Sequence, residues 1–154
     1  MEYSNQKTGK SLQVHLERLN FCDAVAKQSQ CLSRHVGAIL VKDNRIVATG
    51  YNRTPLNTEA CKNCIRKLKK SGEALDICKA LHAEEICILS FLKKYSYADL
   101  KDCILYVSVA PCYNCAKLIT ETGIKQVYAK YDYNSSYTKA IFDEAGVTSH
   151  ILSI

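Results

Sequence analysis

The sequence predicts one α/β domain, in which helices cover both faces of a mostly parallel sheet. The chain has 154 residues, a common length for a single compact domain. After an opening hairpin, runs typical of strands alternate with runs typical of helices, as in proteins with parallel sheets. No repeat, low-complexity block or linker divides the chain. Residues 1–154 are therefore expected to form one domain, with its core at about 12–152.

The first helix is expected from about Ser11 to Gln28. Ser11 is a suitable N-cap, because a serine hydroxyl accepts hydrogen bonds from the first free N–H groups of a helix. Apolar residues recur in this stretch at spacings of three and four, which places them on one buried face. They are Leu12, Leu16, Leu19, Cys22 and Val25.

Two strands are expected next, at Val36–Val41 and Ile46–Thr49. The turn-forming residues 42–45 between them predict an antiparallel hairpin. From Gly50 to about Lys79 the periodicity fades, while basic residues and cysteines accumulate. A loop of this length inside a compact domain is usually functional or held by a specific interaction.

The second half of the chain alternates helix and strand. Helices are expected at Leu81–Lys94, Cys112–Thr122 and Thr138–Glu144, and strands at Ile104–Val109, Val127–Ala129 and Val147–Ile151. In the first of these helices we expect Ile88, Leu89 and Leu92 to face inward. Gly123 and Gly146 are well placed to end the other two.

Composition and charge narrow the class of protein. The polar N-terminal residues 1–10 lack the apolar stretch of a secretory signal, and the longest apolar runs are far too short to span a membrane. We therefore expect a soluble, cytoplasmic protein. The formal charge of +6 suits binding of anions such as nucleotide phosphates or nucleic acid. Nine cysteines without an export signal argue for metal binding or chemistry rather than for disulfides.

Two short motifs indicate a metal centre. One is His82-Ala83-Glu84, and the other is the Pro-Cys-Tyr-Asn-Cys sequence that contains Cys112 and Cys115; each stands where a helix begins. An imidazole and two thiolates are good zinc ligands, and three protein ligands leave a fourth position for water, as in catalytic zinc sites. Helix N-termini also lower thiol pKa values and so favour thiolate ligation. The motifs predict a catalytic zinc bound by His82, Cys112 and Cys115.

Glu84 is the candidate base beside this metal. Residues two apart do not share a face inside a helix, so His82 and Glu84 can converge only near a helix N-terminus. There Glu84 would take a proton from a zinc-activated water and deliver protons to a ring nitrogen and to leaving ammonia. Taken alone, His-x-Glu is common by chance, and Cys-x-x-Cys can be a redox pair or half of a structural zinc site. Together and in this order, they match the signature of zinc deaminases that act on nucleobases.

Further stretches extend the pattern: Cys31–Ala38, Thr49–Asn52, Leu105–Ser108, Cys115–Lys117, Thr122–Lys125 and Ala145–Val147. With the zinc motifs, they resemble the deoxycytidylate (dCMP) deaminases of the zinc-dependent cytidine and deoxycytidylate deaminase superfamily. The resemblance implies a three-layer α/β/α sandwich with a five-stranded mixed sheet, whose first two strands are antiparallel. It also implies hydrolysis of dCMP to dUMP and ammonia, which supplies thymidylate synthesis, and homo-oligomers, often hexamers.

The same resemblance implies residues that contact the substrate. Asn52 would contact the sugar, the N–H of Ala83 the pyrimidine carbonyl, and the carbonyl of Ala110 the amino group. Tyr133 is the best match for a tyrosine that lines the nucleotide site, although it could equally be an aromatic residue packed at the surface.

The chain departs from the family pattern beside the loop that resembles an effector site. Many members are activated by dCTP and inhibited by dTTP. Arg53 and Asn57 stand where glycines are common, and Glu85-Ile86-Cys87 replaces a usual Leu/Gln-Asn-Ala. Arg53 and Ile86 therefore weaken the expectation of dCTP or dTTP regulation and leave the zinc chemistry untouched.

The long loop suggests a second metal. Cys61 and Cys64, with Cys78 and Cys31, offer four thiolates for a structural zinc that would order this segment. Some dCMP deaminases carry a second zinc here, and Cys31 and Cys61 resemble two of its ligands. The alternative is four reduced, unligated thiols. The remaining cysteines, Cys22, Cys87 and Cys103, are expected to be buried packing residues.

A basic run lies in the same loop: Lys62, Arg66, Lys67, Lys69 and Lys70. It could collect phosphates, but a solvated charged surface is the simpler interpretation.

Two other classes of function remain open. One is a deaminase of another cytosine nucleotide or nucleoside, of guanine, or of a base in nucleic acid. A nucleic-acid enzyme would need a basic, aromatic groove, which nothing in the sequence marks. The other is a non-catalytic zinc protein of the DNA-uptake type, against which Glu84 argues because a structural zinc needs no base.

Overall fold

The computed structural model describes residues 2–70, 72–133 and 135–153. One five-stranded sheet has the strand order β2-β1-β3-β4-β5. Its elements, in chain order, are α1 (Glu2–Ala26), β1 (Gly37–Lys42), β2 (Arg45–Tyr51), η1 (Leu75–Ile77), α2 (Ala83–Leu92), η2 (Tyr97–Asp102), β3 (Ile104–Val109), α3 (Tyr113–Thr122), β4 (Gln126–Tyr131), α4 (Ser136–Ala145) and β5 (Thr148–Ile151).

The sheet is mixed. β1 pairs antiparallel with both β2 and β3, whereas β3, β4 and β5 are parallel to one another. The parallel part is thus smaller than the alternation of elements suggests, because β3 joins the antiparallel hairpin at β1. The hairpin turns at Asp43 and Asn44, both of which have positive φ (50° and 61°), as a two-residue primed turn requires.

Helices cover both faces, which confirms the three-layer α/β/α architecture. One core forms where α2, α3 and α4 pack on the sheet, and includes Cys87, Phe91, Leu105, Ile119 and Phe142. A second, smaller core forms under α1 on the opposite face, around Leu19, Cys22, Ile39 and Tyr106. Cys22, Cys87 and Cys103 are buried, as predicted.

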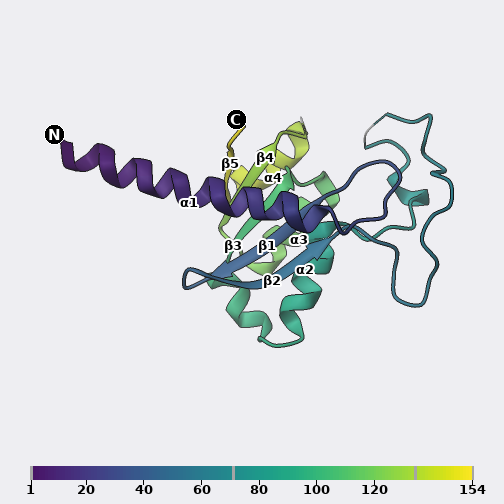
Figure 1. Cartoon of the computed structure of the whole chain (residues 1–154), viewed down its shortest axis with the longest axis horizontal. Helices are drawn as coiled ribbons and strands as arrows, with labels where there is room; N and C mark the ends of the chain where they lie inside the picture. Colours follow the sequence, from purple (N-terminus) through teal and green to yellow (C-terminus); the bar gives the residue numbers. More distant parts are fainter. Residues whose placement is uncertain (1, 71, 134, 154) are drawn as a thin grey trace.

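Helix α1 begins earlier than predicted. It starts at Glu2, so Ser11 lies inside the helix and the prediction that it forms the N-cap is wrong. The glutamine and lysine residues before Ser11 are good helix formers, and no proline stops the helix there. Figure 1 shows that the first part of α1 projects beyond the sheet, which explains why Leu12 is exposed although the pattern predicts it buried.

Helix α2 is rotated relative to the expected inward face. Ile88 is buried, but Leu89 is 53% exposed and Leu92 is 37% exposed, so these two predictions are wrong. The buried residues of α2 also include Ala83, Cys87 and Phe91, which are four apart, and Ala83 and Cys87 lie against Gly50 of β2.

Gly50 of β2 explains this close packing of α2 on the sheet. A Cβ atom on Gly50 would collide with the backbone of Cys87 and Ala83. Glycine therefore lets β2 approach the first turns of α2, the part of the helix that carries the His82 motif.

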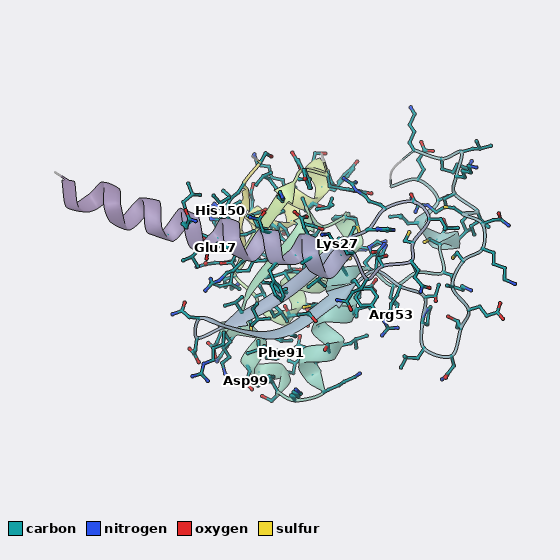
Figure 2. The ribbon with its side chains drawn as sticks, viewed as in Figure 1. Glu17, Lys27, Arg53, Phe91, Asp99 and His150 are labelled. Atoms are coloured by element: carbon teal, nitrogen blue, oxygen red, sulfur yellow. The ribbon has the colours of Figure 1, made fainter. Side chains whose placement is uncertain are left out.

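The segment between β2 and α2 projects from the end of the sheet (Figure 1). Over most of its length it forms turns and irregular structure, with one short 3₁₀ turn at Leu75–Ile77. Its two ends meet in a short bridge: Arg53 N–H donates to the Leu81 carbonyl at 3.1 Å, and Leu81 N–H donates back at 2.8 Å. Figure 2 shows Arg53 where the segment leaves the sheet. No helix in the described ranges is both long and apolar enough to cross a membrane.

Candidate active site

His82 is placed by the start of α2. It is the N-cap residue, with an extended backbone (φ −76°, ψ 157°), and follows directly after the Arg53–Leu81 bridge. Its backbone N–H donates to Glu85 Oε1 at 2.8 Å, which closes the first turn of the helix. The end of the long segment and the start of α2 therefore position the imidazole together.

Cys112 and Cys115 are placed in the same manner by α3. Cys112 is the N-cap, and its carbonyl accepts from Ala116 N–H at 2.8 Å. The chain just before it is held on both sides. Ala110 N–H donates to the Tyr131 carbonyl at 2.7 Å, and the Thr138 hydroxyl donates to the Pro111 carbonyl at 3.0 Å.

These three side chains fit a zinc ion. His82 Nδ1 lies 3.5 Å from Cys112 Sγ and 3.2 Å from Cys115 Sγ. Ordinary zinc–sulfur and zinc–nitrogen bond lengths at a tetrahedral angle give an N···S separation of about 3.6 Å. Among the described residues, these three form the one group of at least three His, Cys, Asp or Glu side chains whose potential ligand atoms all lie within 4.8 Å of one another.

The three groups also polarise one another. Hydrogen bonding from the Cys115 thiol, together with His82, lowers the pKa of Cys112 to about 4. The hydrogen bond with Cys112 raises the pKa of His82 to about 9. The same contact with Cys112, followed by burial, raises the pKa of the Cys115 thiol. The cluster thus shares protons that a divalent cation would displace on binding.

Glu84 is a buried carboxyl group next to this cluster. Only 4% of its surface is exposed. Burial raises the pKa of Glu84 to about 7, against the opposing effect of His82. A buried acid with a pKa near neutrality, beside metal ligands, has the properties of a general acid–base group.

A cavity of about 360 Å³ opens over these groups. It lies within the size range of small-molecule sites. The structure brings all four residues expected to contact the substrate to its wall, together with the metal-site residues His82, Glu84 and Cys112. The four are Asn52, Ala83, Ala110 and Tyr133.

Asn52 is hydrogen-bonded to neighbouring segments of the chain. Its Nδ2 donates to the Arg34 carbonyl at 2.7 Å, and its Oδ1 accepts from Val36 N–H at 2.9 Å. The Ser29 hydroxyl donates to its backbone carbonyl at 2.8 Å. Asn52 therefore fixes the backbone of residues 34–36 at the cavity wall.

Comparison with known proteins agrees with this geometry. A model of the cytidine and deoxycytidylate deaminase zinc-binding region matches residues 12–131. The chain belongs to this family. The match spans both zinc motifs, so the cluster of His82, Cys112 and Cys115 lies within the matched zinc-binding region.

Two relatives and one solved structure illustrate the similarity. The deoxycytidylate deaminase of Schizosaccharomyces pombe is 37% identical over 135 residues, which cover 84% of this chain and 41% of that protein. The deoxycytidylate deaminase of Mycobacterium phage D29 is 36% identical over 119 residues, or 71% of this chain and 88% of that protein. This chain thus spans about two fifths of the yeast relative and most of the phage one.

The solved structure is that of dCMP deaminase from the cyanophage S-TIM5 in complex with dCMP and dUMP. Its fold matches with a TM-score of 0.75 at 24% sequence identity, over 90% of this chain and 97% of that one. It shares the predicted cytidine-deaminase-like fold.

The second group of cysteines is not assembled like the first within this family domain. Cys31, Cys61, Cys64 and Cys78 are free, half-buried thiols. All four line a second, larger cavity of about 960 Å³ beside the long segment. Their sulfur atoms do not form a cluster of three or more within 4.8 Å among the described residues.

The departures from the family pattern have local structural explanations. Asn57 has a φ of +63°, a conformation that favours glycine and that asparagine tolerates better than most residues. Arg53 makes the bridge to Leu81, and its Nη1 donates to the Thr54 carbonyl at 3.1 Å. Ile86 is buried, with 7% of its surface exposed.

Some residues at the cavity could not be recognised from the sequence. No sequence pattern gives Arg34 a role, and the basic run of the long segment is more simply interpreted as solvated surface. The structure places Arg34, Arg66, Lys69 and Lys70 at the cavity wall. Thr138 was missed as the support of Pro111. No periodic pattern marks such residues, because they meet through loops distant in sequence.

Proposed function

We propose that this chain carries out the zinc-dependent hydrolysis of dCMP to dUMP and ammonia. The observation that carries the proposal is the buried Glu84, which lines the cavity beside the cluster of His82, Cys112 and Cys115. The names of the two relatives, both deoxycytidylate deaminases, support this substrate.

The chemistry requires a nucleophile and a proton carrier. A zinc ion held by His82, Cys112 and Cys115 would supply Lewis acidity, which makes water nucleophilic at neutral pH. Glu84 accepts the proton of the attacking water and then donates protons to N3 of the ring and to the departing amine. One water is consumed, one C–N bond breaks, and ammonia leaves.

The cavity wall orients the base. The backbone N–H of Ala83 would meet the pyrimidine carbonyl, and the carbonyl of Ala110 the amino group. Ala83 is fully buried and Ala110 nearly so, which keeps bulk water from these groups. Asn52 and Tyr133 would line the sugar end of the nucleotide.

A substrate panel tests the proposal. The zinc-loaded chain is incubated with dCMP, deoxycytidine, dCTP and a cytosine oligonucleotide, and ammonia release is measured. The proposal expects the highest kcat/KM for dCMP. A higher kcat/KM for the oligonucleotide or for dCTP would show that the chain is a deaminase of that other substrate. No ammonia release from any substrate would favour a non-catalytic zinc protein.

We further propose that Cys31, Cys61, Cys64 and Cys78 close around a second, structural zinc. Their common cavity and the few regular elements between them support this idea, because a metal would stabilise a segment with little apolar core. All nine cysteines are free, which fits a reducing, cytoplasmic compartment.

A homo-oligomer and regulation by dCTP or dTTP are also proposals. Measurement of the mass in solution tests the first. The dCMP assay with added dCTP or dTTP tests the second, for which Arg53 and Ile86, which depart from the family pattern, lead us to expect a weak response.

A further inference from the structure

Charge is distributed unevenly around the catalytic cavity. Four cationic side chains line it: Arg34, Arg66, Lys69 and Lys70. Glu84 is the sole acidic residue among the described residues of its wall. Since Glu84 lies beside the metal cluster, the rest of the wall carries positive charge that Glu84 does not balance.

Arg66 is the best anchored of these cations. Its side chain is half-buried, and its Nε–H donates to the Glu73 carbonyl at 2.8 Å. This bond sets the plane of the guanidinium group and leaves the two terminal nitrogens for another acceptor. A guanidinium presents these nitrogens as a fork that matches the oxygens of a phosphate.

Local turns hold the lysines beside Arg66. Lys69 N–H donates to the Arg66 carbonyl at 2.9 Å, and Glu73 N–H donates to the Lys70 carbonyl at 3.0 Å. The Glu73 carboxylate accepts from Lys70 N–H at 3.3 Å, so this acid is engaged with the backbone of the turn. The cations therefore belong to a structured turn of the long segment.

This turn is fitted against the other side of the cavity. Gly72 has a φ of +86°, and a Cβ atom there would collide with the Tyr133 hydroxyl. Glycine thus allows the turn to lie directly against the loop that follows β4. Across the cavity, the Asn52 amide fixes the backbone at Arg34.

We propose that Arg66 and Arg34, supported by Lys69 and Lys70, bind the 5′-phosphate and make the cavity select nucleotides over nucleosides. This inference rests on the proposed function, since it places the base at Glu84 and the phosphate at the cationic wall. A single monoester phosphate carries nearly two negative charges, which the four cations of this wall more than balance. The cavity volume suits one nucleotide rather than a strand.

The test compares dCMP with deoxycytidine. Arg66→Gln is expected to lower kcat/KM for dCMP about 10–100-fold more than for deoxycytidine, the usual worth of a hydrogen bond to a charged group. The loss should be in KM, because the phosphate is remote from the reacting carbon. Arg66→Lys should recover part of it. Lys67→Gln, next to Arg66 but outside the cavity wall, should keep the wild-type ratio.

Other outcomes would overturn the inference. An equal loss on both substrates would give Arg66 a structural role only. An unchanged ratio in Arg66→Gln and in Arg34→Gln would exclude a phosphate site at this wall. A preference of the wild type for a cytosine oligonucleotide would indicate that the cations of the cavity wall bind a nucleic-acid backbone instead.

Binding of product separates this inference from the proposed function. The affinities for dUMP and deoxyuridine are measured by calorimetry on the zinc-loaded chain, which needs no turnover. Tighter binding of dUMP that Arg66→Gln abolishes supports the phosphate site even if no deamination is found. Equal affinities of the wild type for both ligands would overturn it even if dCMP is deaminated.

Discussion

Two groups of cysteines in this chain differ in how they are held. Cys112 and Cys115 are buried at the start of α3, and His82 faces them from the start of α2. Cys31, Cys61, Cys64 and Cys78 are half-buried on irregular segments and lie around a wide cavity.

The difference shows what preorganises a metal site. α2 and α3 pack on the sheet through residues such as Phe91 and Ile119, so their N-termini are fixed by the core. The side chains of the first group are therefore close together for reasons independent of a metal. The second group has no such support, and a metal would itself have to supply the free energy that brings its thiols together.

The largest expected effect tests whether the first group is catalytic. Glu84→Gln should lower the rate of dCMP deamination about 10²–10⁴-fold, because the proton carrier is lost. Zinc content, measured by elemental analysis, should stay at the wild-type level, since Glu84 is not one of the three ligands. Turnover comparable to wild type would remove Glu84 from the mechanism.

A matched pair of cysteine variants tests the comparison directly. Cys112→Ser should reduce zinc affinity by more than the roughly 10–100-fold that a supporting residue contributes, and activity should fall with it. Cys64→Ser should remove one zinc per chain and leave most of the activity of correctly folded protein. It should also make the segment between Arg53 and Leu81 more susceptible to proteolysis.

The number of zinc ions bound per wild-type chain shows whether the second group of cysteines binds a metal. Two zinc ions per chain are expected. One zinc per chain, lost in Cys112→Ser and retained in Cys64→Ser, would identify the second group as unligated thiols.

A backbone variant tests whether the core positions the first group. Gly50→Ala should destabilise the protein by about 2–3 kcal/mol, because the added Cβ collides with the backbone of α2. The exposed neighbour Thr49 provides the control: Thr49→Ala should cost less than about 1 kcal/mol. Urea denaturation measures both, and equal effects would contradict the close approach of β2 to α2.

The smallest expected effect is on the pH dependence of stability, and it comes from His15 on the opposite face of the sheet. His15 of α1 stacks on Tyr128 at 4.0 Å, and its Nδ1 lies 2.6 Å from the Tyr106 hydroxyl. Burial, with smaller effects of Arg18 and His150, lowers the pKa of His15.

The sign of the pH dependence follows from this shift. Since the folded pKa is below the unfolded value of about 6.5, the unfolded chain binds the proton more readily. Stability should therefore fall as the pH drops from about 7 through the folded pKa. Chemical denaturation between pH 7.5 and 5 measures the free energy of unfolding at each pH. This free energy should fall less steeply with decreasing pH in His15→Gln than in the wild type. Equal pH dependence in the two proteins would contradict the role given to His15.

Regular, strongly patterned elements were the easiest to predict. The strand Ile104–Val109 is confirmed from end to end, because a short apolar run bounded by polar residues has few alternatives as a buried strand. The start of α1 and the exposure of Leu89 could not be predicted, since both depend on where the sheet ends beneath a helix. The spacing of apolar residues carries no such information.

The sequence alone predicts the chemistry of the metal site. An imidazole, two thiolates and a carboxylate at the starts of two helices suffice for that, because helix N-termini impose local geometry that the motif spacing reports. The three-dimensional fold is needed to show which cations of the basic run line the cavity and that the sulfur atoms of the second group of cysteines are not clustered in this structure. Both depend on how a long irregular segment folds back between Arg53 and Leu81, and on contacts such as Gly72 with Tyr133 that join residues far apart in the chain.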